Sequence, residues 1–309
     1  MTINTHVESF AGLPIFEFDP AAAPPEDPSA VALRLSTEFE ETEGFQSKWS
    51  ALLATDWVTR VPALVFGEWG DAYETPVPVE ALIERADRFP ALRALFLGEL
   101  IGEESEITWI QQSDVTPVLR AFPGLEVLRV RGSDGVDLQP GSYPGLKELA
   151  FEAGGLPPEI VAAVSDSNLP DLRHLELWLG TQVYGGNTTV ADLGTILGGA
   201  SLPVLEYLGL RDSEIADELA GALAGASVVG RLQTLDLSLG MLSDTGGVAL
   251  LGGQPLTHLR KLDLHHHFLS GEMMARLREE LEPAGVEVDI SGAMLSSRRP
   301  EDRFIAVSE

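Results

Sequence analysis

The chain has 309 residues, 48 of them acidic and 20 basic, and its formal net charge is −28. A surface of this sign repels nucleic-acid phosphates, so nucleic-acid binding is not expected. No cysteine is present, which excludes disulfides, thiolate nucleophiles and cysteine-ligated metals. The opening MTINTHVESF lacks the basic and apolar regions of a signal peptide, and no apolar run reaches the length of a membrane span. We therefore expect a cytoplasmic protein that does not enter membranes.

Residues 1–60 are predicted to form an α+β cap. The segments 13–18 (LPIFEF) and 31–39 (VALRLSTEF) are predicted strands, and the Pro- and Ala-rich stretch between them is a predicted loop. The segment 45–57 (FQSKWSALLATDW) is a predicted helix. Such a cap would cover the open end of a stacked core.

A hexamer with apolar residues at its fourth and sixth positions recurs from residue 61 onward. The matching segments are VPALVF (61–66), LRALFL (92–97), LEVLRV (125–130), LKELAF (146–151), LRHLEL (172–177), LEYLGL (205–210), LQTLDL (232–237), LRKLDL (259–264) and GVEVDI (285–290). Recurrence in this order, at steps of 21 to 33 residues, indicates stacked units that bury apolar residues against their neighbours. The sixth and fourth positions of each hexamer are predicted to lie on the buried face of a strand.

The segments between the hexamers predict mostly helices. Capping residues or prolines followed by apolar residues at helical spacing are found in 113–122, 157–166, 187–199, 213–225 and 270–281. The segment 132–144 is too short for a full helix and is predicted to be a turn or a short 3₁₀ piece. The segment 102–117 is predicted to add a strand and a loop, with Trp109 in the core. The last segment, 296–309, is predicted to be a frayed tail.

The hexamers resemble the leucine-rich repeat, whose pattern is L-x-x-L-x-L-x-x-N. The steps of 26 to 27 residues with helices between them are similar to the ribonuclease-inhibitor-like subclass. The resemblance implies an α/β solenoid over residues 61–295, with a curved parallel sheet on the concave side and helices on the convex side. The asparagine position is held by other residues, so its turn ladder is expected to be irregular; these residues are Gly180, Ser213, Gly240 and His267.

The whole chain also resembles an uncharacterised family of bacterial cytoplasmic leucine-rich-repeat proteins. The similarity is carried by ITWIQQSDVTP (107–117), VRG (130–132) and LDLHHHFLS (262–270). Some members of that family are encoded near radical-SAM proteins. The resemblance implies the fold and a cytoplasmic location, and it brings no catalytic residues. We expect a non-catalytic protein-binding scaffold or adaptor without a cofactor or a metal.

The residues beside the leucines are predicted to face the concave side, because side chains alternate along a strand. We expect Trp178 and Tyr207 to be exposed anchors, because Trp, Tyr and Arg are favoured at binding hot spots. Asp236, Asp263 and Asp289 would form a carboxylate row that attracts a basic partner surface. Trp178 could instead pack against a neighbouring strand, and the acids could simply be hydrated. The predicted partner-binding residues are Glu176, Trp178, Tyr207, Arg211, Asp236, Asp263, His265 and Asp289.

Three consecutive histidines follow the eighth hexamer. His265 is predicted on the concave side, His266 at the rim and His267 at the turn position, where it would bond the backbone and be more buried than His265. His267→Asn should then be tolerated, since asparagine is usual there. The three side chains would not share a face, so one metal ion could not easily take all three. The alternative to a scaffold is an enzyme or metal-binding protein that uses the acidic and histidine residues of the C-terminal strands.

Overall fold

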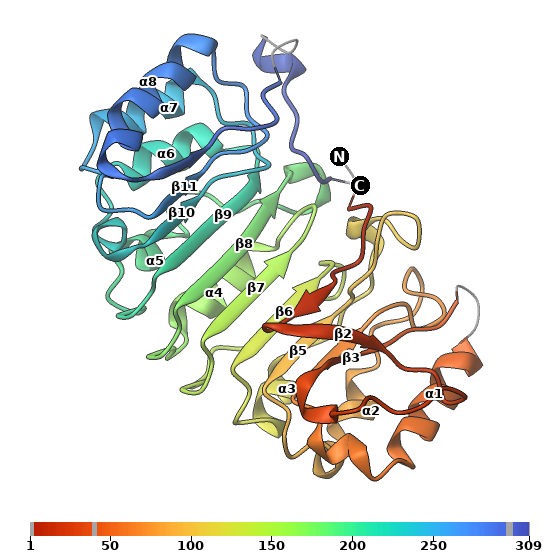
Figure 1. Ribbon diagram of the computed structural model, residues 1–309. Coiled ribbons are helices and arrows are strands. Elements are labelled where there is room, and N and C mark those ends of the chain that lie inside the picture. Colours follow the sequence, from red (N-terminus) through yellow and green to blue (C-terminus); the bar gives the residue numbers. More distant parts are fainter. Residues whose placement is uncertain (1–2, 39–41, 295–298, 309) are drawn as a thin grey trace. The chain divides into compact units, whose positions relative to one another are not determined.

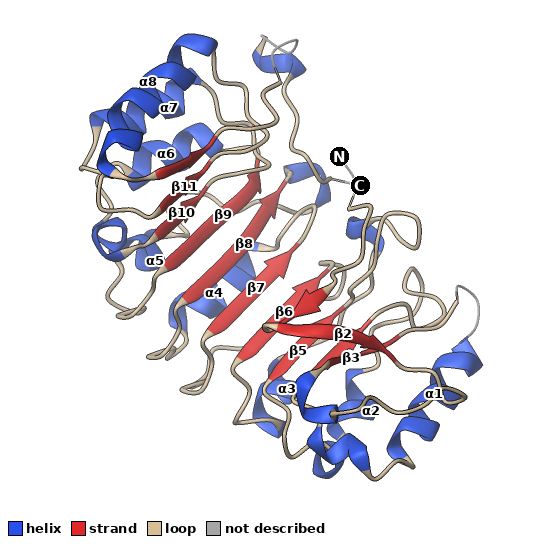
Figure 2. Cartoon of the chain, in the orientation of Figure 1, coloured by secondary structure: helices blue, strands red, loops and turns tan. Residues whose placement is uncertain are grey.

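The computed structural model describes residues 3–38, 42–294 and 299–308. These residues form a mixed α/β structure whose strands are mostly parallel and follow one another in chain order (Figures 1 and 2). The chain divides into two compact units. The first unit comprises essentially residues 2–139 and 145–152, and the second comprises residues 140–144 and 153–308. No helix in the described residues is long and apolar enough to cross a membrane.

The first unit contains seven strands and three helices among its described residues. The strands are β1 (Ser9–Phe10), β2 (Leu13–Glu17), β3 (Ala32–Leu35), β4 (Ala63–Phe66), β5 (Ala94–Leu97), β6 (Val127–Arg131) and β7 (Glu148–Glu152). The helices are α1 (Thr42–Leu53), α2 (Val79–Ile83) and α3 (Thr116–Ala121). β2 and β3, from the predicted cap, pair in parallel and continue into β4.

The second unit alternates helices with parallel strands, so that each strand is followed by a helix before the next one (Figure 2). Its strands are β8 (His174–Gly180), β9 (Tyr207–Ser213), β10 (Thr234–Asp236), β11 (Lys261–Asp263) and β12 (Glu287–Asp289). Its helices are α4 (Pro158–Asp166), α5 (Gly194–Gly198), α6 (Ala216–Leu223), α7 (Asp244–Gly252) and α8 (Gly271–Leu281).

The repeated hexamers align the leucines of neighbouring strands. In the first unit Leu64, Leu95, Leu128 and Leu149 are successive partners, and in the second Leu175, Leu208, Leu235, Leu262 and Val288 are. These leucines are almost completely buried, and removing such side chains from water supplies the main stabilising term. The strands predicted from the nine hexamers are therefore confirmed, as is their parallel pairing within each unit.

The predicted helices between strands are present, but one is shorter than expected and two further helices, α2 and α7, were not predicted. The predicted helix 187–199 shortens to α5, because the Thr189 N–H and hydroxyl both bond the Asp192 carboxylate, at 2.8 and 2.7 Å, and hold a turn there. α7 was not predicted, since Gly246 and Gly247 weaken its helical pattern. The segment 132–144 has no helix, as predicted. Ser270 is the predicted N-cap of α8 and accepts a bond from the Met273 N–H.

The asparagine position is irregular, as expected. Gly180 occupies it at the end of β8 with φ +69, and a Cβ there would overlap the carbonyl of Gly154. Only glycine fits that position without moving the neighbouring backbone.

The prediction that Trp109 lies in the core is wrong. The segment around it forms a short 3₁₀ turn (Ile107–Trp109) and isolated bridges from Gln111 to Asp134 and from Asp114 to Asp137, rather than a full strand. Ile107 and Ile110 take the buried positions, and Trp109 is 43% exposed.

The N-terminal hairpin covers part of the strand face opposite the leucines in the first unit. β1 and β2 pair in antiparallel fashion around Ala11 and Gly12. Phe10 packs on Phe96, with ring centroids 5.6 Å apart, in a buried cluster with alanines and Val65. Val65 and Phe96, which were expected to face outward, are therefore buried by the chain's own N-terminal hairpin.

The prediction of a frayed C-terminal tail is wrong for residues 305–307, which are buried. The Val307 N–H donates to the Asp212 carboxylate at 3.0 Å, and the Ala306 N–H donates to the Leu239 carbonyl at 2.7 Å. Residues 295–298 and 309 lie outside the described residues.

Candidate interaction face

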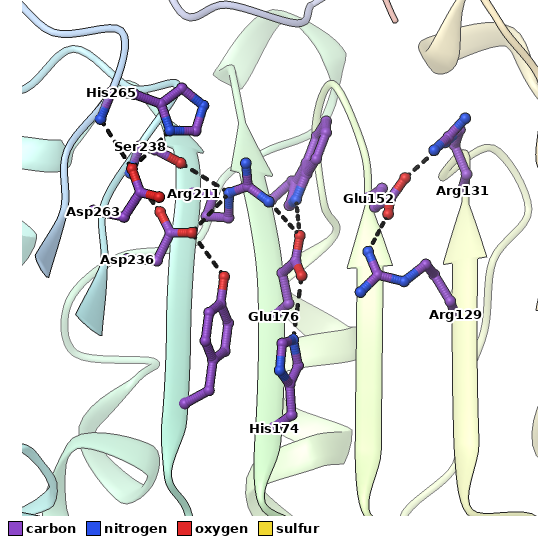
Figure 3. A network of polar contacts seen from close by, with 12 residues as sticks. Arg129, Arg131, Glu152, His174, Glu176, Arg211, Asp236, Ser238, Asp263 and His265 are labelled. Carbon is purple, nitrogen blue, oxygen red and sulfur yellow. Dashed lines mark hydrogen bonds and ion pairs between the residues drawn. The ribbon is translucent and has the colours of Figure 1, made fainter. Parts of the chain in front are cut away.

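The strand face opposite the leucines in the second unit carries all eight predicted site residues, and we call it the polar face (Figure 3). The parallel register sets its residues side by side, with Trp178 beside Arg211 and Asp236, Asp263 and Asp289 in one row. The polar face comprises His174, Glu176, Trp178, Tyr207, Arg211, Asp236, Ser238, Lys261, Asp263, His265, Glu287 and Asp289.

Arg211 is the centre of this face. Its guanidinium donates to Glu176 Oε1 at 2.6 Å and to the Ser238 hydroxyl at 2.9 Å, and its Nε lies 3.3 Å from Asp236 Oδ2. Burial disfavours its charge, but Glu176 and Asp236 outweigh that effect and raise the pKa of Arg211. Arg211 therefore holds two buried carboxylates from the strands on either side of its own (Figure 3).

The expectation that Trp178 is an exposed anchor is wrong, because its side chain is only 6% exposed. The Arg211 guanidinium lies over the indole ring, 5.0 Å from its centroid. The indole N–H donates to Glu176 Oε1 at 2.7 Å. Glu176 and Asp236 are likewise buried, so these residues mainly fix one another.

Tyr207 and His174 form a partly exposed stacked pair on adjacent strands. Their rings are parallel to within 3° and 3.8 Å apart. The Tyr207 hydroxyl donates to Asp236 Oδ2 at 2.7 Å, and His174 Nε2 lies 3.3 Å from Glu176 Oε2. Burial and the two carboxylates raise the pKa of Tyr207, so the phenol stays protonated and remains a donor. His174 was not among the predicted site residues, although it occupies the third hexamer position, as Tyr207 does.

Asp263 is held by His265 and Lys261, which lie two residues away from it on either side in the chain. His265 donates to it from the backbone at 3.1 Å and from Nδ1 at 2.7 Å, and Lys261 Nζ lies 2.9 Å away. Burial alone would raise the pKa of Asp263, but the bonds from His265 and Lys261 lower it well below its usual value. Asp263 is therefore a fixed carboxylate at ordinary pH.

The row of carboxylates is in the predicted register, but it is not unpaired. Lys261 Nζ lies 3.8 Å from Asp289 Oδ2 and 3.6 Å from Glu287 Oε1, in addition to its bond with Asp263. Lys261 was not among the predicted site residues, and it also occupies the third hexamer position. One ammonium group therefore reduces the repulsion between the acids of β11 and β12.

Asp263, His265 and Asp289 could hold a metal ion by distance, because one ligand atom from each lies within 4.8 Å of the others. Carboxylate oxygens and an imidazole nitrogen suit zinc and similar divalent ions. The Lys261 ammonium sits among the same carboxylates, and His265 Nδ1 is already bonded to Asp263. A metal ion would have to displace that lysine.

The three consecutive histidines lie in different surroundings. His267 is fully buried, accepts from the Leu269 N–H at Nδ1 and donates from Nε2 to the Ile290 carbonyl, both at 3.0 Å. This confirms the predicted turn-capping role, and His265 is more exposed, as predicted. His266 was expected at the rim but is only 3% exposed, because its φ of 55° turns it inward and its Nε2 donates to the Phe304 carbonyl.

The first unit has its own closed network on the face opposite its leucines (Figure 3). Arg129 and Arg131 both bond the buried carboxylate of Glu152, and the Arg131 guanidinium lies 5.1 Å from the centroid of the Phe96 ring. Arg131 also donates to the Leu100 carbonyl at 2.6 Å. These charges satisfy one another within the unit.

Comparisons with known proteins identify a structural relative but no activity. No family model and no curated protein matches the sequence. A solved structure of a Bacteroides fragilis protein is similar with a TM-score of 0.80 and 26% identity, over 90% of this chain and 78% of that one. An internalin from Listeria monocytogenes matches with a TM-score of 0.42 and 13% identity, over 88% of this chain and 71% of that one; this similarity is too weak to establish a shared fold. The chain thus shares its mixed α/β fold with the Bacteroides protein.

Proposed function

We propose that the chain is a leucine-rich-repeat solenoid that acts as a non-catalytic protein-binding scaffold through the polar face. The observation that carries the proposal is the fixed arrangement of charged and aromatic side chains on β8–β12. Their bonds to one another hold them in place before any partner arrives, which lowers the entropic cost of binding. The sequence resemblance adds the proposals of a curved sheet, the ribonuclease-inhibitor-like subclass and a cytoplasmic location.

The partner is proposed to present a basic surface. The polar face carries five carboxylates, on Glu176, Asp236, Asp263, Glu287 and Asp289, against the cationic side chains of Arg211 and Lys261 and two histidines, His174 and His265. An excess of negative charge attracts a basic surface and speeds its encounter, with an effect that salt screens.

The residues that touch the partner are proposed to differ from those that position them. Glu176, Trp178 and Asp236 are buried and act by fixing Arg211 and Tyr207. Direct contact would fall to the exposed edges of the face, which are the Tyr207–His174 pair, Lys261, His265, Glu287 and Asp289.

The test is a quantitative pull-down from the source organism, with mass spectrometry as the readout. The variant Glu287→Lys/Asp289→Lys reverses charge on the polar face, while Glu218→Lys/Glu279→Lys makes the same charge change on the exposed sides of α6 and α8. We expect one partner to be lost with the first variant and retained with the second. The reverse result would place binding on the helices and reject the proposal.

A metal-dependent function is the second candidate, favoured by the spacing of Asp263, His265 and Asp289. Calorimetric titration of the purified chain with zinc, nickel or manganese tests it. Stoichiometric binding that is lost in His265→Ala, and strengthened when Lys261→Ala removes the competing ammonium, would favour the metal. The scaffold proposal expects no stoichiometric binding to the unaltered chain.

A further inference from the structure

Two exposed aromatic side chains, on residues that are not part of the polar face, pack against each other in the first unit. Tyr73 is 51% exposed and Trp109 is 43% exposed, and their ring centroids are 5.6 Å apart at an angle of 41°. Their loops follow β4 and β5 in the chain. The exposed part of the two rings gains nothing from burial, and clustered exposed aromatics are typical of binding sites.

The aromatic pair is held in place by the loops that carry it. The Gln111 N–H donates to the Ala72 carbonyl at 2.8 Å, and the Val77 N–H donates to the Gln111 carbonyl at 3.1 Å, so backbone bonds join the two loops. The buried Trp69 donates its indole N–H to the Thr75 carbonyl at 2.8 Å. The two rings therefore form a preorganised surface rather than two independent mobile side chains.

The two loops that carry this pair contain charged residues of one sign only, and two of these acids, Glu99 and Glu104, are paired with Arg34 and His6. The loops 67–78 and 98–115 contain eight acidic residues and no lysine, arginine or histidine. Glu106 accepts the Trp109 indole N–H at 2.9 Å and is exposed, and Glu74 and Glu103 are also exposed. An aromatic face beside carboxylates attracts a cation both through the ring quadrupole and through direct charge.

We propose that Tyr73 and Trp109 are the anchor of a second interaction site, which binds an arginine-bearing basic segment of a protein partner. A guanidinium is planar, so it can stack on an aromatic ring while its N–H groups bond a carboxylate such as Glu106. Lysine offers a point charge without the planar surface and would bind less well. This site lies on other residues than the polar face and does not depend on the function proposed for that face.

The test uses a fluorescein-labelled peptide of alternating glycine and arginine, measured by fluorescence anisotropy up to about 1 mM protein, where weak contacts are still detected. Control peptides replace arginine by citrulline, its neutral isostere, or by lysine. The variants are Trp109→Ala and Tyr73→Ala, which leave net charge unchanged, and Glu26→Gln, which removes an exposed charge outside the two loops. Thermal melting confirms that each variant folds.

We expect the arginine peptide to bind better than the lysine peptide and the citrulline peptide to bind worst. Trp109→Ala and Tyr73→Ala should each weaken binding by about fivefold, and Glu26→Gln should not. Three results would overturn the inference: no binding of the arginine peptide, equal binding of citrulline, or binding that persists in both aromatic variants. If binding persists there but is lost in Glu287→Lys/Asp289→Lys, the peptide binds the polar face, which rejects this site and leaves the proposed function intact.

Discussion

His267 shows how one buried side chain can replace the usual asparagine of a repeat turn. Its two ring nitrogens bond two different backbone groups, the Leu269 N–H and the Ile290 carbonyl. The position was predictable from the repeat, because His267 falls three residues after the last apolar residue of LRKLDL. The second bond was not predictable, because it reaches the following repeat.

We predict that His267→Asn destabilises the chain, contrary to the tolerance expected from the repeat pattern. The shorter side chain can accept from the Leu269 N–H but cannot also reach the Ile290 carbonyl. A buried carbonyl left without a donor costs about 1–3 kcal/mol. Urea unfolding followed by circular dichroism measures the change, with His265→Asn as the exposed control. Unchanged stability of His267→Asn would contradict this assignment.

The buried histidines also predict how stability changes with pH. Burial lowers the pKa of His267 and His266 below the ordinary 6.5. The unfolded chain then binds more protons than the folded one once pH falls below about 7, so the free energy of unfolding decreases from about pH 7 towards the lowered pKa values. Denaturant unfolding at a series of pH values measures this slope, which should be shallower in His267→Asn. Equal slopes in variant and parent would argue against a neutral buried His267.

Whether a side chain of the polar face is exposed was harder to predict than the side of the sheet on which it lies. Alternation along each strand correctly placed Glu176, Trp178 and Arg211 on one face. Whether a side chain on that face meets solvent depends on its cross-strand neighbour, and here Arg211 covers Trp178. Alignment of the hexamers predicts which residues are neighbours, but it does not predict whether one side chain covers the other.

Among the strands, the stacked leucines contribute most to the free energy of unfolding. Leu235 is completely buried between its partners Leu208 and Leu262, so we predict that Leu235→Ala lowers the free energy of unfolding by about 2–5 kcal/mol. Val248→Ala, on the exposed side of α7, is the matched control and should change it by less than about 0.5 kcal/mol. Chemical denaturation compares the two variants. A similar small effect in both would mean that Leu235 is not part of a packed core.

The C-terminal segment behaves as an ordered element in the second unit. The Ala306 and Val307 amides donate to Leu239 and Asp212, so we predict that both exchange their hydrogens slowly. The Glu301 amide, in an exposed 3₁₀ turn, should exchange faster and serves as the internal control. Amide exchange measured by NMR distinguishes them. Fast exchange at all three positions would contradict this assignment and support the predicted frayed tail.

The elements could be predicted where the repeat is regular and not where the chain departs from it. Hexamer spacing located the strands from β4 to β12, because the stacked leucines require the same sequence pattern in every repeat. Local polar bonds at Thr189 shortened α5, and paired glycines concealed α7. The fold-back of Phe10 onto Phe96 is a contact between distant residues that no local pattern encodes.

On the scale of the whole molecule, the net charge of −28 bears on association more than on folding. Much of the charge at the strand faces is paired internally, as at Arg211 with Glu176 and Asp236. Glu287 is exposed and Asp289 is partly exposed, and the two share the single ammonium group of Lys261, so this part of the polar face keeps an excess of negative charge. If the chain is the proposed scaffold, it should bind basic partners faster at low salt than at high salt, because ions screen exposed charges.

The measurement that tests the central claim most directly is carboxylate labelling of the chain with and without its captured partner. Carbodiimide coupling modifies exposed acids, and mass spectrometry reads each position. If the polar face binds the partner, labelling of Glu287 and Asp289 falls on binding while labelling of Glu218 on α6 and Glu279 on α8 does not change. Protection of Glu218 and Glu279 with unchanged labelling of Glu287 and Asp289 would contradict the account.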